Sequence, residues 1–146
     1  MKRILVPLDH SPGSDLIVEY ACALARGLAA ELTLLHVYEP PNAVIAVVPG
    51  ATVAGEDAAE HAAGAAMLGR CAATANLNGF DHVDRILERA ESPSRAIIAH
   101  ARAGKFDLIV MGTHARTGVA RLLMGSVAQD VLRATTCPVL LVHLHA

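Results

Sequence analysis

The chain has 146 residues, of which 53% are hydrophobic, and a formal net charge of −2 at pH 7. This length suits one domain, spanning residues 1–146, that can bury a substantial core. The near-neutral charge provides no basic surface for DNA or RNA, so we expect no nucleic-acid partner. No apolar stretch is long enough for a signal-peptide core or a membrane-spanning helix, so we expect a cytoplasmic protein without membrane contacts.

The first third of the chain predicts a strand, a helix and a second strand. Residues 4–8 form a compact apolar run, and Ser11-Pro12 after it reads as a helix N-cap followed by proline at the first helical position. Residues 31–37 (ELTLLHV) predict the second buried strand. Between them a helix through about Ala29 is expected, with one apolar face made of Ile17, Tyr20, Ala21, Leu24, Ala25 and Leu28. A parallel pair of strands with a right-handed crossover should result.

The middle of the chain predicts a loop, a helix and an edge strand. Prolines bracket the apolar run within residues 40–55, which favours a loop or flap over a central strand. Residues 57–77 predict an alanine-rich helix that ends at Asn78-Gly79. Its expected inner face is Ala58, His61, Ala65, Leu68, Cys71, Ala72 and Ala75. Residues 81–87 mix polar and apolar side chains, as in a strand at the edge of a sheet.

The last third predicts a helix, a strand, a second helix and a final strand. Ser92-Pro93 repeats the Ser-Pro helix start, and Gly104 closes that helix. Leu108 to Met111 is an apolar run short enough for a strand buried on both faces, and Pro138 to His143 predicts the fifth strand. Alternating strands and helices of this kind define the α/β class with a parallel sheet.

Three cysteines, Cys22, Cys71 and Cys137, give an odd count with no CxxC spacing. This pattern favours free thiols in a reducing compartment over a disulfide framework. We therefore expect all three to be buried and unpaired.

The stretch from Asp107 to Leu141 combines a strand, a glycine-containing loop and a helix start. The strand stops at Gly112, the loop contains Gly118, and Gly125-Ser126 opens the helix, with Ser126 and Gln129 spaced as a capping box. Glycine lets the backbone approach a ligand, and the free amides of a first helical turn bind anions. The alternative is that the glycines only form turns and Ser126 only caps the helix.

This stretch resembles the signature of the universal stress protein family, whose nucleotide-binding branch carries G-x2-G-x9-G-[ST]. Gly112 and Gly125-Ser126 match at the expected spacing, while Ala115 replaces the second glycine. The resemblance extends over nearly the whole chain. It implies a single doubly wound five-stranded parallel sheet of order 3-2-1-4-5 with helices on both faces, the Rossmann-like fold of adenine-nucleotide alpha hydrolases.

The implied order places the first and fourth strands side by side, where the winding direction reverses. Ligands of open α/β sheets bind at such a switch point, beyond the carboxyl ends of the strands. Asp9 ends the first strand and Gly112 the fourth, so both should meet at one crevice.

The resemblance also implies an ATP site, with magnesium. Asp9 would accept hydrogen bonds from the ribose, or else serve only the amides of its own loop. The backbone of Val37 would meet adenine, and the loop from Gly112 to Gly118 would wrap the phosphates together with Gly125 and Ser126. Ala115 should weaken binding roughly tenfold or more through strain or crowding. The full expected set is Pro7, Asp9, Val37, Gly112, Thr113, His114, Ala115, Arg116, Gly118, Gly125, Ser126 and Val127.

Two functions remain open on these residues. The first is an ATP-binding stress-response regulatory module without strong catalysis, capable at most of slow incidental ATP hydrolysis. The second is a family member that binds no nucleotide and acts as a dimeric interaction protein, which Ala115 favours. An enzyme is disfavoured because GxxxxGK[ST], GxGxxG and GxSxG are all absent from the sequence.

A homodimer through the C-terminal strand is the expected assembly. Residues 139–142 would leave an apolar edge on a monomer, and such edges pair with a second copy. The resemblance implies dimerisation at the same place. His143 and His145 lie on this segment, but two histidines without a third ligand make a poor metal site.

Overall fold

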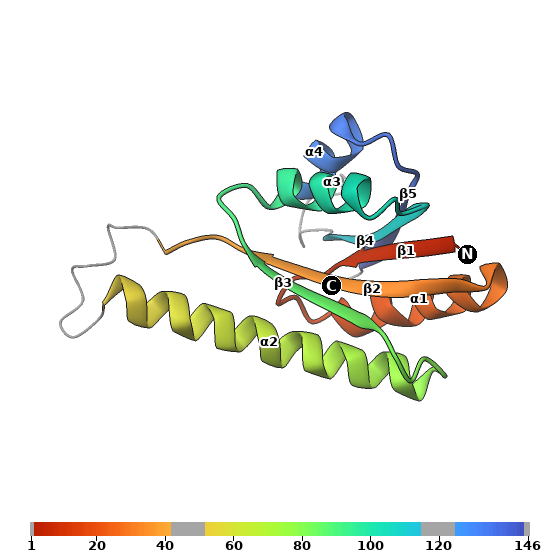
Figure 1. The fold of residues 1–146 in the computed structure, drawn as a ribbon, viewed down its shortest axis with the longest axis horizontal. Helices are drawn as coiled ribbons and strands as arrows, with labels where there is room; N and C mark the ends of the chain where they lie inside the picture. The colour runs from red at the N-terminus through yellow and green to blue at the C-terminus, as the bar shows by residue number, and fades with distance from the viewer. Residues whose placement is uncertain (1, 42–51, 115–124, 145–146) are drawn as a thin grey trace.

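A five-stranded parallel sheet forms the centre of the fold in the computed structural model, which describes residues 2–41, 52–114 and 125–144. The strand order is β3-β2-β1-β4-β5, which confirms the expected order and the doubly wound α/β class (Figure 1). The strands are β1 (Lys2–Pro7), β2 (Ala30–Tyr38), β3 (Asp84–Arg89), β4 (Leu108–His114) and β5 (Val139–Leu144).

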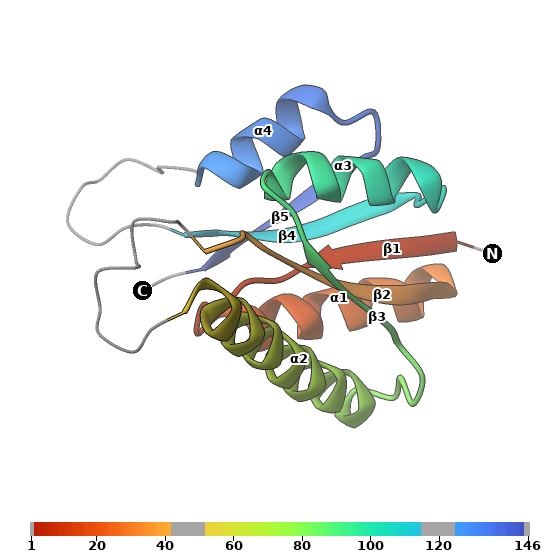
Figure 2. The same cartoon turned by 60° about the vertical axis from the view of Figure 1, so that its left-hand side comes forward.

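The helices cover both faces of this sheet. They are α1 (Ser14–Leu28), α2 (Val53–Leu77), α3 (Pro93–Ala103) and α4 (Ser126–Ala134). Helices α1 and α2 lie on one face, and α3 and α4 lie on the other (Figures 1 and 2). Since the crossovers from β1 and β2 use one face and those from β3 and β4 use the other, the winding reverses between β1 and β4.

The core is split by the sheet into two layers. Ile4 and Val6 of β1 pack toward α1 and α2, whereas Leu5 between them packs toward α3 and α4. All three are at most 1% exposed because β1 is the central strand and is covered on both faces. The polar mixture predicted for an edge strand falls on β3, which lies at the sheet edge and begins at Asp84, later than the sequence pattern indicated.

The two predicted Ser-Pro helix starts have different outcomes. Ser92 caps α3 as predicted, accepting a hydrogen bond from the Arg95 amide, and Pro93 is the first helical residue. The prediction for Ser11-Pro12 is wrong, since α1 begins at Ser14 with Gly13 as its N-cap and no side-chain cap.

The boundaries around the glycine stretch also differ from the prediction. β4 does not stop at Gly112 but continues to His114, because Gly112 and Thr113 pair with Val142 and His143 of β5. Ser126 does not cap α4; Gly125 is the N-cap and Ser126 is the first helical residue. The predicted capping box is therefore wrong.

The buried faces of the first two helices are partly as predicted. In α1 Ile17, Ala21 and Ala25 are buried as predicted, whereas Tyr20 and Leu28, which were predicted to face the core, are 51% and 42% exposed. Helix α2 begins at Val53, earlier than predicted, and the buried residues of its inner face include Gly64, Met67, Leu68, Cys71 and Ala75. Ala58, His61 and Ala65, predicted for that face, are exposed, although the His61 ring contacts Tyr38 of β2.

The thiols are free, and two of them are buried as expected. Cys22 and Cys71 lie inside the layer formed with α1 and α2, whereas Cys137 is only partly buried, which corrects the expectation for that residue.

Most of the proline-bracketed segment, residues 42–51, lies outside the described residues, so the loop prediction stays a prediction. In the described ranges, no helix has the length and apolar character needed to cross a membrane.

Candidate functional site

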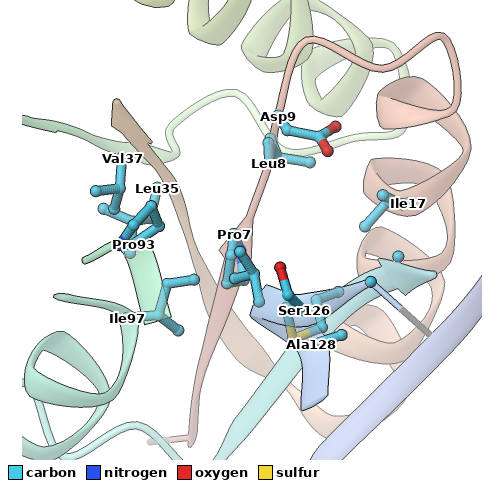
Figure 3. Close-up of a pocket in the computed structure, with 14 residues that line it drawn as sticks. Pro7, Leu8, Asp9, Ile17, Leu35, Val37, Pro93, Ile97, Ser126 and Ala128 are labelled. Atoms are coloured by element: carbon cyan, nitrogen blue, oxygen red, sulfur yellow. The ribbon is translucent and has the colours of Figure 1, made fainter. Parts of the chain in front are cut away.

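A cavity of about 280 Å³ opens beyond the carboxyl ends of β1 and β4, where the winding of the sheet reverses (Figure 3). The switch point is the position at which open α/β sheets bind ligands. The residues that line it are Pro7, Leu8, Asp9, Ile17, Leu35, Val37, Pro93, Ile97, Met111, Gly112, Gly125, Ser126, Val127 and Ala128.

The wall of this pocket is mostly apolar, with two polar groups at its mouth. Leu35, Val37 and Ile97 line one side and Ile17 the opposite side, with Ser126 between them (Figure 3). The Asp9 carboxylate and the Ser126 hydroxyl are the polar side-chain groups among the described lining residues. An apolar pocket with a few placed polar groups is typical of sites for small organic ligands.

The N-terminus of α4 supplies an anion-binding feature at the same place. The first hydrogen bond of this helix runs from the Gln129 amide to the Gly125 carbonyl, at 3.1 Å. The amides of residues 126–128 therefore precede the intrahelical ladder. These amides carry the partial positive charge of a helix N-terminus. Because Ser126, Val127 and Ala128 all line the pocket, that charge lies beside the apolar cavity.

Asp9 is held by the turn that follows β1. Its Oδ1 accepts a hydrogen bond from the Ser11 amide at 3.0 Å, and its main-chain carbonyl accepts one from the Ser14 hydroxyl at 2.7 Å. The expectation that Asp9 serves its own loop is therefore met, and the same residue also lines the pocket. The two interpretations are compatible because a carboxylate has acceptor sites for several donors.

Gly112 has a packing role in addition to its place in the pocket wall. A Cβ at this position would lie 2.6 Å from Ile17 Cδ1 and 2.9 Å from Leu144 Cδ1. Glycine thus allows α1 and β5 to approach β4 closely. The sequence pattern left phosphate binding or a turn as roles for this residue, and it could not show these neighbours because they are distant along the chain.

The structure brings together seven of the predicted site residues at the pocket: Pro7, Asp9, Val37, Gly112, Gly125, Ser126 and Val127. Thr113 does not line it; this residue is buried, and its hydroxyl lies 3.1 Å from His143 Nδ1 on β5. His114 ends β4. Ala115, Arg116 and Gly118 lie outside the described residues, so their predicted contacts stay predictions.

The sequence pattern did not predict the pocket residues contributed by α1 and α3. Ile17 lies on the buried face of α1, while Pro93 and Ile97 come from the first turns of α3. The Ser-Pro start of α3 is a local signal that a helix N-terminus follows β3, and because all strands are parallel this N-terminus lies at the carboxyl edge of the sheet. His36 on β2 was also given no role, although its ring contacts the main chain beside Asp9.

The described part of the chain offers little for covalent or metal chemistry at this site. It contains no group of three or more histidine, cysteine or acidic residues able to hold a metal ion. Burial raises the pKa of the Cys71 thiol to about 11, and burial also raises the pKa of Cys22 and Cys137. Thiols that stay protonated at neutral pH are poor nucleophiles.

Comparison with known proteins relates this chain to one family. The model of the universal stress protein family matches residues 1–143. A universal stress protein of Thermus aquaticus is 34% identical over 141 residues, covering 97% of this chain and 98% of that protein. Another, from Methanocaldococcus jannaschii, is 31% identical over 141 residues, covering 97% of this chain and 81% of that protein.

Solved structures show the same fold. UspA of Lactobacillus plantarum superposes with a TM-score of 0.79 at 21% identity, covering 97% of both chains. A universal stress protein in complex with cAMP has a TM-score of 0.69 at 23% identity, covering 99% of this chain and 98% of that one. An Archaeoglobus fulgidus universal stress protein in complex with dAMP has a TM-score of 0.65 at 20% identity, covering 97% of both. The family match over nearly all residues, with relatives above 30% identical, establishes that the chain belongs to the universal stress protein family.

Proposed function

We propose that this protein is a stress-response regulatory module that binds an adenine nucleotide, ATP with magnesium, in the pocket at the β1–β4 switch point. The observation that carries the proposal is the joint placement of three features around one cavity: an apolar wall, the Asp9 carboxylate and the N-terminus of α4. The complexes of two related folds with cAMP and dAMP support the choice of an adenine nucleotide.

Each part of a nucleotide has a matching chemical environment. The adenine ring would lie against the apolar side formed by Leu35, Val37 and Ile97. The Asp9 carboxylate would accept hydrogen bonds from the ribose hydroxyls. The amides at the start of α4 would bind phosphate oxygens, and the Ser126 hydroxyl would donate a further hydrogen bond. In such sites magnesium is held largely by the phosphates together with one or two carboxylates. Asp9 is the carboxylate among the described residues that line this pocket.

The proposal includes no strong catalytic activity, and at most slow incidental ATP hydrolysis. Among the described residues that line the pocket, Asp9 is the one with an ionisable side chain, and it already accepts the Ser11 amide. Efficient hydrolysis needs a base or metal assembly that positions the attacking water. The composition of the described lining supports ligand binding over catalysis in this proposal.

Thermal unfolding with and without ATP and magnesium tests this function. A ligand present at about 100 times its Kd stabilises the native state by about 2.7 kcal/mol, so the melting temperature should rise. Ser126→Ala removes a donor to a charged group, worth about 1.5–3 kcal/mol, and should reduce that rise. Thr136→Ala, exposed and away from the pocket, is the matched control and should leave the rise unchanged.

The competing function is a dimeric interaction protein without nucleotide. Ala115 at the position of the second motif glycine favours it. An unchanged melting temperature at millimolar ATP, together with no nucleotide released from freshly purified and denatured protein, would support this alternative and exclude the first function. GTP in place of ATP tests whether the pocket selects adenine.

A homodimer through β5 is part of the proposal for either function. β5 lies at the sheet edge in the described structure, and Leu140 on it is 38% exposed. An exposed strand edge with apolar side chains favours pairing with a second copy. Light scattering should give the mass of a dimer for the wild type and of a monomer for Leu141→Pro, since proline removes a backbone donor from the edge.

A further inference from the structure

His36 of β2 is a buried histidine that contacts the main chain next to the pocket. Its side chain is 4% exposed, and its Nδ1 lies 2.7 Å from the carbonyl oxygen of Leu8. Since a carbonyl oxygen only accepts, Nδ1 carries the hydrogen and donates it. The other ring nitrogen, Nε2, is buried and has no hydrogen-bond partner among the described residues.

The surroundings of this ring keep it neutral. Helix α2 packs over it so closely that a Cβ on Gly64 would lie 2.9 Å from His36 Cδ2. The ring of His10 meets it edge-on at 4.8 Å between centroids, and the nearby charged groups are Asp9 on the same turn as His10 and Glu60 on α2. Burial, above the other influences, lowers the pKa of His36 below its ordinary value, so the uncharged ring persists at neutral pH.

Leu8 is consequently fixed from both sides. Its amide donates to the Leu35 carbonyl at 2.8 Å, and its carbonyl accepts from His36 Nδ1–H at 2.7 Å. β1 has already ended at Pro7, so these two bonds hold the first residue outside the strand. The next residue is Asp9, whose carboxylate lines the pocket. The path of the chain into Asp9 therefore depends on a side chain of the neighbouring strand.

Packing alone does not explain a histidine at this place. An apolar side chain such as leucine would fill the volume without burying an unpartnered ring nitrogen, which is unfavourable. What histidine adds is the Nδ1–H donor aimed at the Leu8 carbonyl.

We propose that His36 is a positioning residue of the nucleotide pocket, which fixes the Leu8 carbonyl and thereby the direction in which Asp9 is presented to the ligand. This inference deepens the proposed function and rests on it for the identity of the ligand. The positioning of the turn itself can be measured without any ligand.

Three variants separate a donor from a space-filling side chain. Asn carries an N–H the same number of bonds from the backbone as Nδ1, Gln places its N–H one bond farther, and Leu has none. His36→Leu and His36→Gln should weaken ATP binding in calorimetry by roughly threefold to tenfold, the worth of one hydrogen bond. His36→Asn should restore most of the affinity. In ligand-free samples, ¹⁵N relaxation should show increased motion of the amides of residues 9–11 in Leu and Gln but not in Asn.

Leu32→Ala is the control for general destabilisation, because Leu32 is buried on the same face of β2, away from the turn. It should lower stability without altering amide motion at residues 9–11. The inference would be overturned if ATP affinity and turn motion did not differ among the three His36 variants. It would also be overturned if His36→Leu lost ATP affinity and His36→Asn failed to recover it. If the wild type bound no adenine nucleotide, the proposed function would fall, and the relaxation data would still decide whether His36 holds the turn.

Discussion

The starts of α1 and α3 carry the same dipeptide, Ser-Pro, and use it differently. At α3, Ser92 accepts the Arg95 amide and Pro93 begins the helix. At α1, Ser11 and Pro12 precede the helix, and Gly13 takes the N-cap position without any side-chain cap. Both dipeptides follow a strand of the same parallel sheet, so their place in the fold does not account for the difference.

One local contact and one long-range contact distinguish the start of α1. The Ser11 amide donates to Asp9 Oδ1, which turns the chain before a helix can begin. Gly13 has φ −85°, which any residue can adopt, but a Cβ there would lie 2.6 Å from Leu144 Cδ1 on β5. The Ser-Pro signal therefore decides the start of α3, whereas at α1 the Asp9 turn and the close approach of Leu144 accompany a later start.

The largest expected effect comes from making the two helix starts alike. Gly13→Ser introduces a residue that is favoured at N-caps, yet its Cβ would overlap the Leu144 side chain, which is 6% exposed and packed in the core. Overpacking of this kind costs about 1–3 kcal/mol. Urea unfolding should show that loss of stability despite the better capping residue.

The reverse exchange is the control for this prediction. Ser92→Gly should cost only a few tenths of a kcal/mol, because glycine is tolerated at N-caps. In a Leu144→Ala background, which removes the overlapping atoms, Gly13→Ser should cost less than in the wild type. Equal stability of Gly13→Ser and wild type would show instead that Leu144 moves aside freely.

A smaller effect is expected for the cap of α3. Ser92→Ala removes the hydroxyl that accepts the Arg95 amide and leaves the helix start otherwise unchanged. Loss of a serine N-cap costs about 0.5–2 kcal/mol. Ser92→Thr, which retains a hydroxyl acceptor, should keep most of the stability, and urea midpoints of the two variants measure the difference. A cost as large for threonine as for alanine would mean that the hydroxyl is not what stabilises this helix start.

The smallest effect is expected at the other Ser-Pro. The Ser11 hydroxyl is buried and has no hydrogen-bond partner among the described residues. Ser11→Ala therefore loses no bond, and the change in stability should stay within about 0.5 kcal/mol, with a slight gain because a buried unpartnered hydroxyl is removed. A loss comparable to that of Ser92→Ala would show that Ser11 acts as a cap in solution and would remove the contrast between the two helix starts.

The candidate site was predictable where its residues follow strands or open helices. Asp9 after β1 and Gly125-Ser126 at the start of α4 are marked by local patterns, and the structure places all three at one pocket. Ile17 and Ile97 were not predicted as site residues because a helix buries such side chains in any case, and only the packing of α1 and α3 turns them toward this cavity.

The sequence alone determined the alternation of strands and helices, the edge character of β3 and the cap of α3, because each depends on residues adjacent in the chain. The extension of β4 to His114 depends on pairing with β5, and the close approach of Leu144 to Gly13 at the start of α1 depends on where β5 lies. Only the tertiary structure could decide them. The same holds for the hydrogen bond from His36 to Leu8, whose partners are 28 residues apart and meet only because β1 and β2 are neighbours in the sheet.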